Sequence, residues 1–224
     1  TNDIIMISFT TKLRANLLTF CFSAKQNAQK QVICAQKKKF VQRRQVIIGV
    51  MGAGSGVGTT HTALLFSAYL SGCGLFQTAF VELNDSQDIR RLLHTTRKHY
   101  GICYFPSASS GQLWKLKEGG YERIVVDFGH GGNREEFLRC DIRVVCVALS
   151  SWKGEECLQI LRMEDEKILN RFHFVMAFGS EKERKRLERG YHFQIHRLPF
   201  VEDPLLISKA SYEVLKEMEW LNLE

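Results

Sequence analysis

The chain has 224 residues, of which 45% are hydrophobic and 25% are charged, and its net charge is +7. This is the composition of a soluble globular protein with a sizeable core. Three prolines are too few for a linker-rich or disordered chain, and no apolar run reaches the length of a transmembrane helix. Seven scattered cysteines without a C-x-x-C pair argue against a zinc site or disulfide framework and favour a reducing cytosol.

The positive charge is concentrated at the N-terminus. Residues 1–45 contain nine Lys or Arg and one acid, Asp3, so they carry +8 and the remainder carries −1. We therefore expect a basic extension over 1–45 and one folded domain over 46–224. The extension is either a solvated tail or, through residues 12–44, a contact region for an anionic membrane or nucleic acid.

From Val46 onward, apolar runs alternate with helix-like segments. The expected strands are 46–51, 78–83, 102–105, 123–127, 142–149, 172–178 and 192–197. The expected helices are 60–70, 86–98, 110–117, 132–139, 154–170, 181–189 and a last one opened by Asp203-Pro204. Such alternation is typical of βαβ units, so the predicted fold is α/β, with three layers and a doubly wound, mainly parallel sheet.

A glycine-rich turn follows the first expected strand. Its glycines allow a tight turn in which successive N–H groups approach an anion, and the following helix adds the positive end of its dipole. The usual phosphate loop reads G-x-x-x-x-G-K-[ST], but Ala53 stands at the first glycine and Thr59 at the lysine. The candidate nucleotide-binding residues are Gly54, Ser55, Gly56, Val57, Gly58, Thr59, Thr60 and His61, with Pro199 from a later loop.

Three more segments fall where strands are expected to end. They are 80–87, which contains Glu82, 124–129, which contains Asp127, and the loop 198–204. Ligands of open α/β sheets bind at the carboxyl ends of the strands, so we expect all three near the glycine-rich turn.

Together these segments resemble the MinD/ParA branch of P-loop NTPases, in the SIMIBI class, whose loop reads K-G-G-x-G-K-T-T. The resemblance places the two family lysines on Gly54 and Thr59, which are uncharged, and the loop threonine on Thr60. The family's aspartates after the second strand fall on Glu82 and Asn84. The sequence G-V-G-T-T-H is similar to the loop of divergent members of the TadZ/CpaE type, which act in pilus assembly and polar placement.

The resemblance implies ATP or ADP bound with Mg²⁺, and a metal site formed by Thr60, Glu82 and Asp127, the last in the Walker B position. No adenine-reading asparagine stands near 177–179. Without either lysine we expect weak or absent hydrolysis, and we assign no catalytic residue. The family further implies a cytoplasmic protein, or one at the inner membrane face, that forms a homodimer and docks on a protein of a localisation or assembly machine.

Other interpretations stay open. The chain is alternatively a pseudo-ATPase scaffold that holds protein partners without nucleotide, a DNA-partition ATPase, or a protein similar to bacterial tyrosine kinases, although its tail has only Tyr212. The glycine-rich turn alone is compatible with a purely structural connection, and His61 with an ordinary first-turn helix residue. The charged run 181–189 is typical of a solvated helix face.

Overall fold

The computed structural model describes residues 44–93, 98–150, 153–163 and 166–221. The expected N-terminal extension lies almost entirely outside these residues. The strands are β1 (Val46–Gly52), β2 (Thr78–Glu82), β3 (Lys98–His99), β4 (Ile102–Phe105), β5 (Arg123–His130), β6 (Ile142–Leu149), β7 (Phe172–Gly179) and β8 (Ile195–Arg197). The helices are α2 (Thr59–Gly72), α3 (Asp88–Leu93), α4 (Ser110–Leu116), α5 (Arg134–Leu138), α6 (Gly154–Met163), α7 (Glu166–Leu169), α8 (Glu181–Tyr191) and α9 (Lys209–Glu217), followed by a 3₁₀ turn, η1 (Glu219–Leu221).

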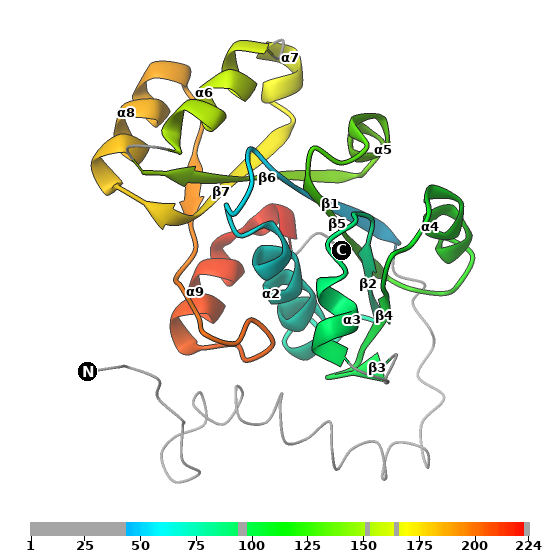
Figure 1. The fold of residues 1–224 in the computed structure, drawn as a ribbon. Helices are drawn as coiled ribbons and strands as arrows, with labels where there is room; N and C mark the ends of the chain where they lie inside the picture. The colour runs from blue at the N-terminus through cyan, green and yellow to red at the C-terminus, as the bar shows by residue number, and fades with distance from the viewer. Residues whose placement is uncertain (1–43, 94–97, 151–152, 164–165, 222–224) are drawn as a thin grey trace, which may run out of the picture.

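The described strands form one sheet in the order β3-β4-β2-β5-β1-β6-β7-β8. All neighbouring strands are parallel except β3 and β4, which are antiparallel. Helices cover both faces, with α2 and α9 on one and α4, α5, α6 and α8 on the other (Figure 1). The predicted three-layer, mainly parallel α/β fold is confirmed. None of the described helices is long and apolar enough to cross a membrane.

Each central strand supplies side chains to two cores, one on each face of the sheet. In β1, Ile48 and Val50 pack under α2 and α9, whereas Ile47 packs on the opposite side. This division follows from the two-residue repeat of a strand. Because both faces are covered, the strands are apolar throughout, which is the pattern that predicted them.

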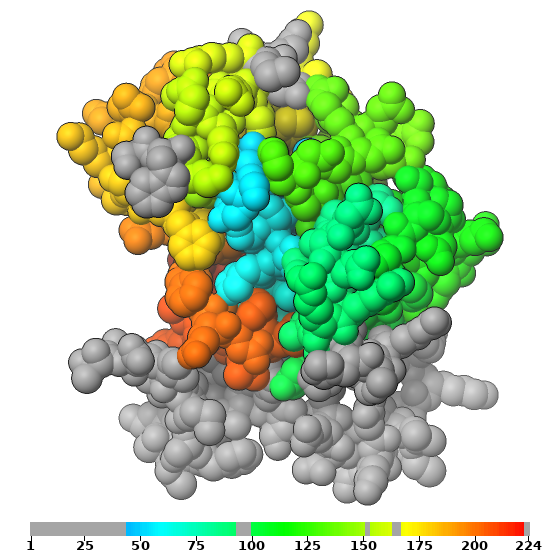
Figure 2. Space-filling model, viewed as in Figure 1, coloured from blue at the N-terminus to red at the C-terminus, as the bar shows by residue number. Residues whose placement is uncertain are grey.

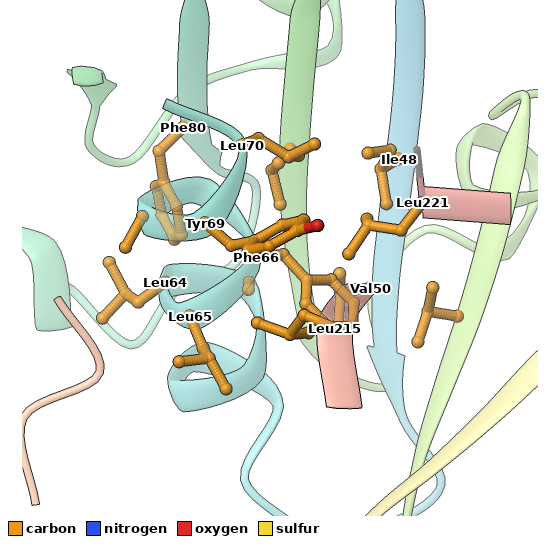
Figure 3. Packing of buried hydrophobic residues seen from close by; sticks show 14 of the residues in the cluster. Ile48, Val50, Leu64, Leu65, Phe66, Tyr69, Leu70, Phe80, Leu215 and Leu221 are labelled. Carbon is orange, nitrogen blue, oxygen red and sulfur yellow. The ribbon is translucent and has the colours of Figure 1, made fainter. Parts of the chain in front are cut away.

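Helix α2 is buried over most of its surface because it lies between the sheet and the C-terminal segment. Figure 3 shows its side chains meeting Val50 of β1 and Leu215 of α9 in one cluster. Phe66 packs edge-on against Trp220, with ring centroids 6.0 Å apart. The helix that carries the first turn after the glycine-rich loop is therefore held firmly on two sides.

The expected helix over 86–98 was wrong in extent. Helix α3 spans only Asp88–Leu93, and Lys98–His99 pair with β4 as the antiparallel edge strand β3. Residues 94–97 lie outside the described part. Left-handed Tyr100 and Gly101, with φ of 49° and 76°, make the turn between β3 and β4. A helical pattern cannot reveal such a tight turn, because Tyr100 gives no turn signal in the sequence.

The expected start of the last helix was also wrong. Asp203 accepts a hydrogen bond from the Leu205 N–H at 2.9 Å, which closes a local turn rather than opening a helix. Helix α9 begins after Ser208, whose hydroxyl accepts from the Ser211 N–H at 3.1 Å. Likewise, the strand expected from His192 begins at Ile195, because His192 adopts φ of 56° and ends α8.

Candidate functional site

The glycine-rich turn connects β1 to α2 at the centre of the sheet. Gly58 adopts φ of 90° and Gly56 φ of 70°, which are left-handed conformations that favour glycine. At Gly52 a Cβ atom would lie 2.5 Å from the Thr59 hydroxyl oxygen, so the strand end has no room for a side chain. The glycines thus hold the loop against the start of α2.

The backbone N–H groups of this loop have few partners. Ala53 N–H donates to the Cys146 carbonyl at 2.8 Å, and Thr62 N–H donates to the Gly58 carbonyl at 2.9 Å. Among the described residues, the N–H groups of residues 54–61 donate no well-formed backbone hydrogen bond, although residues 55 and 56 form a turn. Free N–H groups at the start of a 14-residue helix provide a binding site for an anion.

A cavity of about 810 Å³ lies over the loop. Figure 2 shows the loop region, in blue to cyan, exposed on the surface between the green and the yellow parts of the chain. The cavity is lined by Gly54, Ser55, Gly56, Gly58, Thr59, Thr60, His61, Leu83, Asn84, Asp85, Ser86, Asp88, Ser107, Ala108, Phe128, Gly129, His130, Gly131, Gly132 and Asn133. None of these described lining residues is Lys or Arg.

Asp127 lies beneath this cavity, on β5. It is fully buried and stands beside Val50 of β1 and Glu82 of β2. Its Oδ1 accepts from the Gly129 N–H at 2.9 Å, whereas Oδ2 is buried with no hydrogen-bond partner among the described residues. Burial raises the pKa of Asp127, and the Thr60 hydroxyl and the Gly129 N–H oppose this rise. An orphaned carboxylate oxygen of this kind fits a cation.

The sequence-based end of this strand at Asp127 was wrong. The strand continues to His130, with a shift in its pairing to β1 after Val50. The Asp127 side chain therefore projects from within the strand.

Glu82 has a different environment from Asp127. It is fully buried, and its Oε1 accepts from the Ile89 N–H at 3.1 Å and the Ser86 hydroxyl at 3.3 Å. Its Oε2 accepts from the Ser107 N–H at 3.1 Å. Glu82 thus ties the loops after β2 and β4 together, and it does not line the cavity.

The structure brings most of the predicted nucleotide-binding residues to the cavity, but not all. Val57 is buried in the core beneath the loop, and Pro199 does not line the cavity. The residue after it, Phe200, stacks on the ring of His61 with centroids 6.0 Å apart. His61 Nε2 also shares a hydrogen bond with the Val201 carbonyl at 2.8 Å, so its ring joins the 198–204 loop to α2.

Two residues next to the loop were missed by the sequence analysis. The Lys153 ammonium donates to the Ser55 carbonyl and to Glu156 Oε1, both at 2.8 Å. Glu156 Oε2 is buried without a hydrogen-bond partner among the described residues, and it lies where a Cβ on Gly54 would point. Lys153 immediately precedes α6 and Glu156 lies in its first turn, nearly a hundred residues away from the loop in sequence, where no local motif marks them.

No group of three or more His, Cys, Asp or Glu able to hold a metal ion by themselves occurs among the described residues. His61 and His130, which line the cavity, belong to no such group. A metal at this site would therefore need ligands from a bound molecule or water in addition to Asp127 and Thr60.

Comparison with known proteins supports the fold. No family model matches the chain, and no curated protein sequence matches it. Solved structures do match. The ParA family ATPase from Chlorobium tepidum TLS has a TM-score of 0.54 at 19% identity, over 80% of this chain and 95% of that one. MinD from Aquifex aeolicus has a TM-score of 0.58 at 14% identity, over 79% and 97%.

A plasmid partition protein from Borrelia burgdorferi B31, solved with AMPPNP bound, has a TM-score of 0.55 at 14% identity, over 80% of this chain and 99% of that chain. At these identities the likeness establishes the fold, which is that of the ParA and MinD ATPases. The chemistry of this chain has to be inferred from its own residues.

Proposed function

We propose that the chain binds ATP or ADP with Mg²⁺ at the glycine-rich loop and works as a nucleotide-responsive positioning or assembly factor. The observation that supports the proposal is that two sets of unsatisfied groups lie close to one cavity, one in its lining and one buried next to that lining. Unpartnered N–H groups of residues 54–61 offer donors to phosphate, and the orphaned Oδ2 of Asp127 lies beneath the same cavity. A nucleotide with its metal satisfies both.

Thr60 and Asp127 are the residues that would hold Mg²⁺, with phosphate oxygens and water completing its ligands. The ion would neutralise charge on the phosphates. Glu82 drops out of the metal set that the resemblance implied, because three donors already occupy its two oxygens. Its place in the proposed site is to fix the loops after β2 and β4, which line the cavity.

Hydrolysis in this proposal is weak or absent. The described lining of the cavity offers no Lys or Arg to stabilise charge on a transferred phosphoryl group. Asn84, at a family aspartate position, donates its amide to the Asp127 carbonyl at 3.0 Å and is not a base.

The wider role is proposed by analogy with the fold. In this proposal the nucleotide-bound chain forms a homodimer and docks on a protein of a localisation machine, such as pilus or secretion apparatus of the TadZ/CpaE kind. It does so in the cytoplasm or against the inner face of the membrane. The basic stretch 12–44 would add contact with anionic lipid or nucleic acid.

The second candidate is a pseudo-ATPase scaffold that binds protein partners and no nucleotide. The same lack of a Lys or Arg in the described lining favours it.

Titration calorimetry with AMPPNP, with and without Mg²⁺, distinguishes nucleotide binding from the scaffold function. We expect Mg²⁺-dependent binding in the wild type and loss of the Mg²⁺ dependence in Asp127→Asn. Glu118→Gln, which changes an exposed acid outside the lining of the cavity, should bind as the wild type does. Absence of AMPPNP binding to the wild type would overturn the nucleotide-binding proposal and favour the pseudo-ATPase scaffold.

A further inference from the structure

The site proposed above lacks a cation in its described lining, yet one lies just outside. The Lys153 ammonium donates to the carbonyl of Ser55, and Ser55 itself lines the cavity. Lys153 therefore contacts the backbone of the loop on which a phosphate would rest. Its side chain is only 26% exposed, so it is held in place rather than free in solvent.

Glu156 holds this lysine on the outer side of the loop. Their ion pair is 2.8 Å long and joins positions three residues apart at the start of α6. The second carboxylate oxygen, Oε2, is buried without a hydrogen bond among the described residues and is packed against Gly54. Half of this carboxylate is thus poorly satisfied, which makes the pair less favourable than its short distance suggests.

We propose that Lys153, the residue just before α6, is the phosphate-binding lysine of this site in place of the lysines missing from the loop, and that Glu156 retains it until a nucleotide arrives. The inference rests on the proposed function. On binding, the ammonium turns from Glu156 toward the phosphates while its position beside Ser55 changes little. No bond is made or broken; the lysine exchanges one anionic partner for another.

The exchange is physically favourable for two reasons. A lysine is a point charge on a flexible four-carbon stem, so it can reorient without moving the backbone. A bound triphosphate offers more negative charge than one carboxylate, and its oxygens accept charge-assisted hydrogen bonds. Glu156 is a competitor for the same cation, and it also places negative charge against the loop at Gly54.

A purely structural brace makes a different prediction. If Lys153 and Glu156 only stiffen the loop, removing either partner loosens it, and both changes weaken binding. If Lys153 binds phosphate and Glu156 competes for it, the two changes act in opposite directions. The sign of the Glu156 effect therefore separates the two roles.

The test uses the full chain with AMPPNP and, separately, inorganic tripolyphosphate, both with Mg²⁺, in titration calorimetry. We expect Lys153→Met to weaken both ligands by about tenfold to a hundredfold, as for a lost charge-assisted hydrogen bond. Lys153→Arg should recover most of the loss. Glu156→Gln should tighten both by about twofold to fivefold, as for release from a partly exposed ion pair.

The matched controls are Glu155→Gln and Lys185→Met. Glu155 lies in the same first turn of α6 but pairs with Arg162 at 2.7 Å, so its loss removes the same charge without touching the loop. Lys185 lies on α8 and is 63% exposed. Neither control should change the affinity for tripolyphosphate by more than about twofold.

Each result has a definite meaning. Weaker binding in both Lys153→Met and Glu156→Gln, or no change in Lys153→Met, would overturn this inference while leaving the proposed nucleotide site intact. Failure of the wild type to bind either ligand would overturn the proposed function, and this inference with it. Thermal melts of each variant, compared with the wild type, show whether a loss of binding reflects unfolding.

Discussion

At the residue scale, the site is defined by which polar groups are satisfied. Asp127 and Glu82 are neighbours across β5 and β2, and both are fully buried. Glu82 has donors on both oxygens, whereas one oxygen of Asp127 has none among the described residues. Two acids that look alike in the sequence therefore have different environments: Glu82 connects two loops, whereas Asp127 keeps one carboxylate oxygen without a hydrogen-bond donor among the described residues. Sequence alone cannot distinguish them, because the donors to Glu82 come from the following helix and from a loop 25 residues away.

The first residue-scale prediction concerns Glu82. Glu82→Gln places an amide group where two backbone N–H groups now donate, so at least one of them loses its acceptor. We expect the free energy of unfolding to fall by about 1–3 kcal/mol. Urea denaturation measures it, with Glu118→Gln as an exposed control that should change little. An unchanged unfolding midpoint in Glu82→Gln would show that the loops after β2 and β4 do not depend on this carboxylate.

The second residue-scale prediction concerns the missing loop lysine. The Thr59 side chain is buried and points toward Gly52 at the base of the loop. Thr59→Lys adds a cation at the family position, and we expect AMPPNP to bind about tenfold more tightly. Thr59→Met, of similar length but uncharged, should give no gain. If Thr59→Lys fails to strengthen binding while remaining folded, the loop does not face a phosphate.

At the element scale, the central strands and α2 were predictable because burial on both faces leaves apolar runs of the right length. The strands at 102–105 and 142–149 agree with the sequence-based bounds. The sequence-based bounds were wrong where one residue pattern is compatible with two structures. Asp203-Pro204 fits a helix start and also the turn that the structure contains. The Lys153 contact with the loop joins residues 98 positions apart in sequence, and no local sequence pattern predicts a contact between such distant positions.

The element-scale prediction concerns the attachment of η1 to β7 and β8. His173 stacks on Trp220 with centroids 4.3 Å apart, and the Trp220 indole N–H points at His196 Nε2 at 3.5 Å. Burial, assisted by the nearby His196 and Arg143, lowers the pKa of His173 to about 4. Burial also lowers the pKa of His196.

Because the folded protein holds His173 neutral, the unfolded chain binds more protons between pH 6.5 and about 4. Stability should therefore fall as the pH drops through this window and should level off below it. Urea denaturation followed by tryptophan fluorescence from neutral to acidic pH measures the fall. In His173→Phe, which keeps the stacking but cannot titrate, the fall should be shallower. An identical pH profile in the variant would exclude His173 as a source of acid sensitivity.

At the scale of the whole molecule, the fold places the loop, Asp127 and the Lys153–Glu156 pair at one end of a parallel sheet. This follows from the topology, since the carboxyl ends of β1, β2, β5 and β6 meet there. The fold of the ParA and MinD ATPases was therefore predictable from the strand–helix order and the glycine-rich turn. The charges around the glycine-rich turn could not be predicted from the sequence, because they depend on how the start of α6 packs beside the turn.

The whole-molecule prediction concerns turnover. Fast phosphoryl transfer needs groups fixed in advance to stabilise the charge that develops. The described lining of the cavity offers backbone N–H groups but no fixed cation, and the orphaned carboxylate oxygen of Asp127 is buried beneath that lining. A lysine retained by Glu156 supports binding better than it supports a transition state, because the ion pair must first be exchanged. We therefore expect the purified protein to release phosphate from ATP at a rate near background even when ATP is bound.

Phosphate release by the purified chain, with no partner or lipid present, is the measurement that bears on this prediction. A partner can supply an arginine or lysine in trans, so acceleration in its presence leaves the prediction intact. Asp127→Asn serves as the control for contaminating activity, since it should remove only Mg²⁺-dependent catalysis at this site. Robust release by the wild type that disappears in Asp127→Asn would mean that the cavity already contains a competent catalytic site. Lys153→Met would then show whether Lys153 provides its cation.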